Sequence, residues 1–191
     1  MSEENRKETG FPMMVGERLF KRRQIIITGG IDDQVARNVS AGLLALAADG
    51  DDPITLFLSS PGGHVESGDM IYDMIKFVRP TVRIVGSGWV ASAGALIFVA
   101  AKKENRLCLP NTRFLLHQPS GGMGGHAADI AIQAEQIIKM RERLNEIFSR
   151  ETGQPIERVS RDTDRDFWMT PEQAIDYGLL GRVIHAEADL G

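Results

Sequence analysis

The stretch Ile54–Val78 reads ITLFLSSPGGHVESGDMIYDMIKFV and contains one complete strand–turn–helix unit. Residues 54–59 form a short apolar run of strand-forming side chains, and the turn Ser60-Pro61-Gly62-Gly63 follows it. Apolar side chains then recur at helical spacing up to Val78, and Arg79-Pro80 ends the pattern. A buried strand followed directly by a helix indicates a sheet that is covered by helices.

The same alternation of strand and helix signals occupies the chain as far as His117. A β-branched run ends at Gly29-Gly30, and Asp32 or Asp33 is placed to cap the helix that follows. Further strands are expected at 24–28, 82–85, about 106–109 and 113–116, with a small-residue helix from near Ser92. Strand–helix–strand units at this spacing predict an α/β fold with a mainly parallel sheet, because parallel strands need crossover connections.

The pattern changes after His117. A glycine-rich segment, Gly121–Gly125, precedes a helix that begins near Asp129, has one apolar side and ends at Gly153. About 24 residues at 1.5 Å per residue give a helix of roughly 36 Å, which is longer than the core of such a chain requires. We therefore expect this helix to project and to pack against another subunit. The alternative is a long helix that lies across its own sheet.

Length and charge narrow the class of protein. The chain has 191 residues and a formal net charge of -4, which suit one domain and argue against a binder of nucleic acid or anionic membranes. We expect a mobile N-terminal arm at 1–20 and a single domain at 21–191. Residues 1–10 lack the apolar core of a signal peptide, and no apolar run is long enough to cross a membrane, so the cytoplasm is the expected location.

Cysteine and histidine usage argues against disulfide and metal chemistry. The single cysteine, Cys108, has no partner in the chain and is interpreted as a small buried apolar residue. The four histidines show no zinc-ligand spacing, so no metal site is expected. No phosphate-binding Gly-x-x-x-x-Gly-Lys-Ser/Thr loop occurs, so any nucleotide hydrolysis would have to come from a partner.

Three side chains are candidates for catalysis, although each has a structural alternative. Ser92 lies where a strand gives way to a helix, so helix N–H groups would stabilise an anion beside it, but it would also serve as a helix cap. His117 ends an apolar strand, a rigid position for a general base or for a structural histidine. Asp166 is one of three carboxylates at 162–166 that are able to cap the next helix or pair with an arginine. The Gly62-Gly63 turn offers backbone N–H groups, either as half of an oxyanion hole or as a tight turn alone. Spacing does not show that these elements converge.

Several motifs together resemble the proteolytic subunits of Clp proteases (the ClpP family, peptidase family S14). They occur in the order and spacing of that family and cover about residues 20–185. The motifs are SPGG at 60–63, ASAGA at 91–95, LPNTR at 109–113, HQP at 117–119, GQP at 153–155, RDTDRD at 161–166 and AIDYGL at 174–179. The resemblance implies a ClpP/crotonase-like fold of repeated ββα units with a mainly parallel sheet and a projecting handle helix, the handle spanning about 119–152.

The resemblance also implies catalytic roles. Ser92 would be the nucleophile, His117 the base that takes its proton, and Asp166 the group that orients and stabilises the imidazole. The backbone N–H groups of Gly63 and Ala93 would form the oxyanion hole.

A substrate path and an assembly follow from the same resemblance. An extended substrate would add as a strand beside 63–66, so that Gly63, Val65 and Ser120 would bind it. The substrates would be unfolded proteins delivered by an AAA+ Clp unfoldase, and no cofactor is implied. The family stacks two heptameric rings around a chamber. For this chain the resemblance implies either rings that contain only copies of it or mixed rings that also contain another ClpP. Arg165 resembles the family's ring-contact arginine.

The chain departs from the family pattern in places that bear on function. Trp89-Val90-Ala91 replaces the usual small run before the serine, and Ala93 stands where methionine is frequent. The N-terminal arm around Gly16-Glu17 also differs, in the region that meets the unfoldase, which is typical of a divergent paralogue. The alternatives are a non-catalytic ring component of a mixed assembly and a crotonase-like acyl-CoA enzyme, which would share the architecture without needing the triad.

Overall fold

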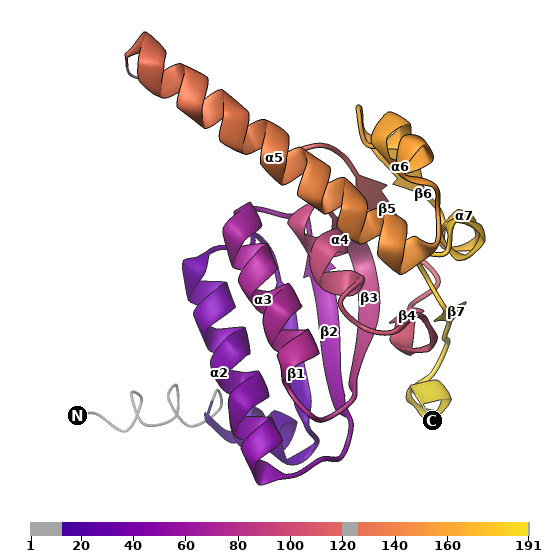
Figure 1. The fold of residues 1–191 in the computed structure, drawn as a ribbon. Coiled ribbons are helices and arrows are strands. Elements are labelled where there is room, and N and C mark those ends of the chain that lie inside the picture. Colours follow the sequence, from indigo (N-terminus) through magenta and orange to yellow (C-terminus); the bar gives the residue numbers. More distant parts are fainter. Residues whose placement is uncertain (1–12, 120–125, 191) are drawn as a thin grey trace, which may run out of the picture.

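A mainly parallel sheet forms the centre of the molecule (Figure 1). The computed structural model describes residues 13–119 and 126–190. The parallel strand order is β1-β2-β3-β4-β7, while β5 pairs in parallel with the C-terminal end of β3, and β6 pairs antiparallel with β5. The predicted α/β fold with a mainly parallel sheet is confirmed. The strands are β1 (Gln24–Thr28), β2 (Ile54–Ser60), β3 (Val82–Ala91), β4 (Arg106–Cys108), β5 (Arg113–Leu116), β6 (Phe167–Met169) and β7 (Arg182–Val183).

Three helices, α2 (Asp33–Asp49), α3 (Val65–Phe77) and α4 (Ala93–Phe98), cover one face of this sheet (Figure 1). Asp32 caps α2, because its side-chain oxygen accepts a 2.8 Å hydrogen bond from the N–H of Val35. Burial of apolar side chains between sheet and helices is the main stabilising contribution to the fold. The fully shielded side chains of this core include Leu43, Ile54, Leu56, Ile71, Ile84 and Phe98.

The helix α5 (Ala127–Thr152) projects away from the rest of the domain (Figure 1). Along its outer half Ile132 is 59% and Ile138 57% exposed, whereas Leu144 and Phe148 near its end are buried in the core. Gly153 ends the helix in the left-handed conformation, with φ 77°. The expectation of a projecting helix is confirmed. No helix in the described part of the chain is long and apolar enough to cross a membrane.

Some elements differ from what the sequence patterns indicate. β3 continues past Val85 through Gly86-Ser87-Gly88 to Ala91, because β2 pairs along one edge while β4 and then β5 pair along the other. The short helix α6 (Ile156–Asp162) and the strand β6 were not anticipated, and α7 (Pro171–Tyr177) was expected only as a helix somewhere after residue 166. Residues 13–21 are helical although the sequence shows no periodicity there. The rest of the N-terminal arm lies outside the described residues.

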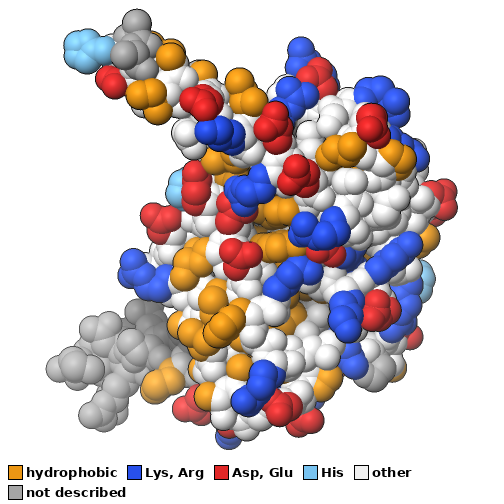
Figure 2. All heavy atoms as spheres, in the orientation of Figure 1, with side chains coloured by type: hydrophobic (Ala, Val, Ile, Leu, Met, Phe, Trp, Pro, Cys, Tyr) orange, Lys and Arg blue, Asp and Glu red, His pale blue; other side chains and the backbone are white. Residues whose placement is uncertain are grey.

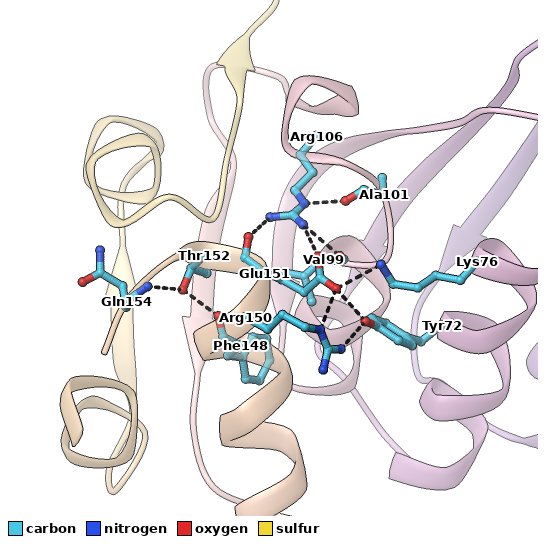
Figure 3. A network of polar contacts seen from close by, with 10 residues as sticks. All are labelled: Tyr72, Lys76, Val99, Ala101, Arg106, Phe148, Arg150, Glu151, Thr152 and Gln154. Atoms are coloured by element: carbon cyan, nitrogen blue, oxygen red, sulfur yellow. Dashed lines mark hydrogen bonds and ion pairs between the residues drawn. The ribbon is translucent and has the colours of Figure 1, made fainter. Parts of the chain in front are cut away.

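A buried polar network fastens the end of α5 to α3 and α4 (Figure 3). At its centre is the guanidinium of Arg106, whose side chain is 1% exposed. On the α3 side, Tyr72 Oη and Lys76 Nζ each lie 2.9 Å from Oε1 of Glu151. The network therefore joins α3, the C-terminal end of α4, which is the helix that follows Ser92, and the end of α5. The groups that accept from Arg106 are the carbonyls of Val99 (3.0 Å), Ala101 (2.7 Å) and Glu151 (2.7 Å) and the carboxylate of Glu151 (3.0 Å).

Candidate active site

Ser92 lies between β3 and α4 in a rarely occupied backbone conformation. Its φ is 55° and its ψ is -122°, and Arg23 is the other described non-glycine residue with positive φ. A 3.0 Å hydrogen bond from its N–H to the Leu115 carbonyl and a 3.1 Å bond from the Leu96 N–H to its own carbonyl hold this conformation. The side chain makes no capping hydrogen bond, so the interpretation of Ser92 as a helix cap is wrong. Its hydroxyl is not committed to α4.

The Gly62-Gly63 turn lies directly against Ser92. A Cβ atom added at Gly62, where φ is 101°, would lie 2.5 Å from Ser92 Cβ. A parallel bridge fixes the turn from the other side: the N–H of Ile31 donates to the Gly62 carbonyl at 2.9 Å, and the N–H of His64 donates to the Ile31 carbonyl at 2.8 Å. Within the described residues, the N–H of Gly63 has no hydrogen-bond partner. The turn therefore brings a rigid, unpaired donor to the neighbourhood of the serine.

The strand register places His117 beside Asp166. Leu116, the last residue of β5, pairs with Phe167, the first residue of β6, in an antiparallel register that makes the next residues neighbours. His117 Nδ1 lies 3.3 Å from Asp166 Oδ1, and the histidine side chain is 27% exposed. The segment after the strand is anchored as well, because the N–H of Gln118 donates to the Thr163 carbonyl at 2.6 Å.

The other two carboxylates of the acidic run have different partners. Asp164 Oδ1 accepts from Arg141 of α5 at 3.2 Å. Asp162 Oδ2 accepts from the Tyr177 hydroxyl at 3.2 Å. Of the three, Asp166 is the one that faces His117.

Ser92 and His117 line one small, mainly apolar pocket. Val65, expected to bind substrate, lies in its wall, whereas Ser120 lies outside the described residues. The pocket brings together side chains from α3, α4, α5 and the end of β5. Its other lining residues are Ala93, Leu96, Leu116, Pro119, Leu144 and Phe148.

The buried thiol outside this site is not set up for reaction. Cys108 on β4 is completely buried, and burial raises its pKa to about 11. A thiol with such a pKa is almost entirely protonated at neutral pH and is a poor nucleophile. The interpretation of Cys108 as a small apolar core residue is confirmed.

Comparison with known proteins is consistent with this geometry. A sequence model described as Clp protease matches residues 7–187. The chain belongs to the Clp protease family.

Relatives of this Clp protease chain include named proteolytic subunits. The chain is 63% identical over 172 residues to the ATP-dependent Clp protease proteolytic subunit of Paracoccus denitrificans, covering 90% of this chain and 86% of the relative. It is 58% identical over 188 residues to proteolytic subunit 3 of Rhizobium meliloti (strain 1021), covering 98% and 96% respectively. ClpP1 from Listeria monocytogenes has a similar structure, with a TM-score of 0.85 at 47% identity over 93% of this chain and 99% of that chain. These similarities favour a proteolytic subunit over a crotonase-like acyl-CoA enzyme.

Two features of this Clp protease site were not evident from the sequence. Leu144 and Phe148 of α5 reach the pocket, although their apolar spacing indicated only that one side of the helix is buried. The second feature is the position of Trp89, where the chain departs from the family pattern. It is not among the pocket's lining residues, and its side chain is 45% exposed on β3, next to the buried Val90. Because neighbouring strand residues point to opposite faces, Trp89 faces away from the helices.

Proposed function

We propose that this chain is the serine endopeptidase subunit of a self-compartmentalised Clp protease, with Ser92, His117 and Asp166 as its catalytic triad. The observation that carries the proposal is that Ser92, in its strained junction, and His117 line one pocket. His117 is paired with Asp166 at 3.3 Å, and the turn that carries the unpaired N–H of Gly63 packs against Ser92 through Gly62.

The proposed chemistry is acyl transfer. Asp166 accepts from Nδ1–H of His117, which leaves Nε2 free to take the proton of Ser92 as its oxygen attacks the peptide carbonyl. The N–H groups of Gly63 and Ala93 stabilise the oxyanion that forms. The imidazolium then donates its proton to the leaving amine, and water releases the acyl group by the same route. Apart from this water and the substrate, side chains and backbone amides of the chain supply every group in the mechanism.

Substrate binding is proposed to use main-chain contacts and one apolar side-chain pocket. An extended peptide pairs with residues 63–66, which places Gly63, Val65 and Ser120 along its path. The side chain before the cut enters the pocket walled by Leu144 and Phe148, so apolar residues are favoured there. Backbone pairing is tolerant of sequence, which suits the degradation of unfolded proteins.

Energy for unfolding is proposed to come from an AAA+ Clp unfoldase, because the chain carries no phosphate-binding loop of its own. The relatives are named as subunits of ATP-dependent proteases. The proposed assembly is two stacked heptameric rings of this chain, with mixed rings containing a second ClpP as the alternative. The proposed location is the cytoplasm, where the single cysteine stays reduced.

Covalent labelling of the assembled protein tests the proposed nucleophile. A fluorophosphonate should add one label, located on Ser92 by mass spectrometry, and Ser92→Ala should lose both the label and at least about 10³-fold in fluorogenic-peptide turnover. Ser87→Ala, on the same strand, is the matched control and should retain both.

Two results would contradict this function. An assembled wild type that takes no label and cleaves no peptide would favour the non-catalytic ring component. A Ser92→Ala variant that keeps full activity on an acyl-CoA thioester would favour the crotonase-like enzyme.

A further inference from the structure

The two tryptophans of the chain, Trp89 and Trp168, lie close together on the sheet face that the helices leave uncovered. Trp89 is 45% and Trp168 37% exposed. Arg113 lies between them: it is the register partner of Trp89, and its guanidinium carbon sits 4.2 Å from the centre of the Trp168 ring. We call Trp89, Arg113 and Trp168 the tryptophan patch.

Strand geometry fixes the direction in which this patch points. The residue that follows Trp89 and the one that follows Arg113 are fully buried in the core with the helices, and the residue after Trp168 is nearly so. Because successive side chains alternate between faces, the patch is on the opposite, uncovered face. Exposed tryptophans around an arginine have the composition of the residues that contribute most to binding at protein interfaces. Those buried neighbours are Val90, Phe114 and Met169.

A second row of exposed side chains, on α3, is complementary to the tryptophan patch because it carries the opposite charge. Met70 is 46% and Phe77 74% exposed, and the exposed Asp73 lies between them at helical spacing. Among the described residues the Asp73 carboxylate makes no ion pair within 4 Å, because Arg143, the cation that its charge influences, is paired with Asp69. We call Met70, Asp73 and Phe77 the α3 ridge. Figure 2 shows hydrophobic side chains on the outer surface of α2 and α3 among acidic and basic ones.

The two surfaces also match in length. The α3 ridge spans eight residues of helix, and its seven steps of 1.5 Å give about 10 Å. The tryptophan patch crosses two strand spacings, from β3 over β5 to β6, which is also about 10 Å. Both surfaces therefore place one charge between two large apolar side chains at the same separation, and the two charges are opposite.

We propose that the tryptophan patch of one copy of this chain packs on the α3 ridge of the next copy, with Arg113 paired to Asp73 between the apolar groups. The patch and the ridge lie on different faces of the molecule, so the contact is head-to-tail, the kind of contact from which a ring is built when the rotation between copies closes. This inference rests on the ring assembly proposed above and names the side chains that fasten it.

The contact also supports the catalytic geometry. Each residue of the tryptophan patch lies on a strand that a triad position directly follows or precedes: Ser92 follows β3, His117 follows β5, and Asp166 precedes β6. A neighbour that clamps the ends of β3, β5 and β6 from behind holds all three triad segments in register. The positioning effect of this patch is therefore expected on turnover as well as on assembly.

Intrinsic fluorescence gives the first test, because Trp89 and Trp168 are the only tryptophans of the chain. Emission of the full-length protein is recorded as assemblies are dissociated by dilution, with native mass spectrometry reporting the oligomer. If both indole side chains are buried in the contact, the assembled protein should emit at a shorter wavelength than the dissociated protein. The size of this shift should follow the oligomer population. Identical emission in assembled and dissociated protein would overturn the inference.

Charge reversal gives the second test. Arg113→Asp and Asp73→Arg should each raise the midpoint concentration of assembly at least about 10-fold, and the double variant should recover most of the loss. Lys102→Asp, an exposed reversal outside both surfaces, is the control, and circular dichroism checks that each variant is folded. A conservative Trp89→Phe should assemble like the wild type, whereas Trp89→Ser should not.

The remaining outcomes separate this inference from the proposed function. Wild-type assembly of both single reversal variants, or a double variant no better than either single, would overturn the pairing and leave the protease assignment intact. Unchanged assembly with a raised KM for peptides would make the tryptophan patch a substrate surface, which also overturns it. A wild type that never forms an oligomer but still cleaves peptides would overturn both the inference and the proposed rings.

Discussion

Ser92 holds a backbone conformation with φ 55° that costs free energy in any residue other than glycine. Such strain persists only where surrounding contacts determine the conformation, and here they come from Leu115, Leu96 and the packed Gly62. The consequence is chemical. The side chain is turned away from the role of a helix cap and toward the pocket that it shares with His117.

Gly62 is the residue on which this geometry depends most closely. In Gly62→Ala the new Cβ would lie 2.5 Å from Ser92 Cβ and 3.0 Å from the Ala91 carbonyl, so Ser92 or the turn has to move. Because a displacement of about 1 Å in a catalytic group costs about 10²-fold in rate, we expect kcat for a fluorogenic peptide to fall by about that factor. Steady-state kinetics on the assembled variant measures the effect.

A matched glycine separates steric displacement from backbone strain. Gly153 also has positive φ, 77°, but a Cβ there would meet nothing within 4 Å. Gly153→Ala should therefore lower the melting temperature and leave kcat close to wild type. Equal losses of kcat in the two variants would show that Gly62 acts through stability and not through Ser92.

The sequence predicts the roles of individual site residues to different extents. The residues alone leave Ser92 open between nucleophile and cap, and the resemblance to a family favours the nucleophile. The structure shows that its side chain makes no capping hydrogen bond. The carboxylate at 166 was chosen among three by that resemblance, since local sequence treats the three alike. What separates them physically is non-local: the β5–β6 register brings Asp166 to His117, while Arg141 and Tyr177 engage the other two.

At the scale of elements, the end of α5 depends on the charged network around Glu151 (Figure 3). Burial opposes ionisation of this carboxyl, but hydrogen bonds from Lys76 and Tyr72 and the charge of Arg106 outweigh it, so its pKa is held below the ordinary value. Burial lowers the pKa of Arg106, against the opposing influence of Glu151. Each charge is therefore tolerated inside the protein because the other is present.

Removing the carboxylate charge should destabilise the folded chain in a pH-dependent way. We expect Glu151→Gln to lower the free energy of unfolding at pH 7 by about 2–3 kcal/mol, because Arg106 keeps its buried charge and loses its counter-ion. Since the folded-state pKa of Glu151 is depressed, its contribution is present above the unfolded-state pKa and disappears as the pH falls through the folded-state pKa. The difference between wild type and variant should therefore shrink at acidic pH.

Chemical denaturation at fixed protein concentration, repeated between pH 7 and pH 3, measures this difference. Glu135→Gln is the control: it removes an exposed pair with Lys139 on the same helix and should cost no more than about 0.5 kcal/mol. A Glu151 variant as stable as this control at pH 7 would show that the network contributes nothing net.

Elements with strong local signals were predictable, and those formed by tertiary contacts were not. The glycine stop of α5 and the first two strands follow from short-range propensity and spacing, as does an aspartate cap of α2, which the structure places at Asp32 of the two candidates. β3 crosses Gly86-Ser87-Gly88, which disfavour a strand by themselves, because neighbouring strands pair with it on both edges. The two-to-three-residue strands β6 and β7 carry too little pattern to be read alone and exist because β5 and β4 are there to pair with them.

At the scale of the whole molecule, the single chain exposes large apolar side chains in several places. Beyond the tryptophan patch and the α3 ridge, the outer half of α5 exposes Ile132 and Ile138. These two side chains lie on a helix that extends past its own core (Figure 1). Exposed isoleucines on a projecting helix indicate a contact with a partner, and in the proposed assembly that partner is another copy and the contact joins the two rings.

A charge at either isoleucine should separate the rings without unfolding the subunit. Ile132→Glu and Ile138→Glu each place a carboxylate where the proposed contact buries an isoleucine, so we expect particles of half the wild-type mass by native mass spectrometry. Their circular dichroism should match the wild type, because both side chains are more than half exposed in the single chain. Lys139→Gln, on the same part of α5, should leave the mass unchanged. Full-mass particles from both isoleucine variants would mean that α5 does not join the rings, and its exposed isoleucines would then need another partner.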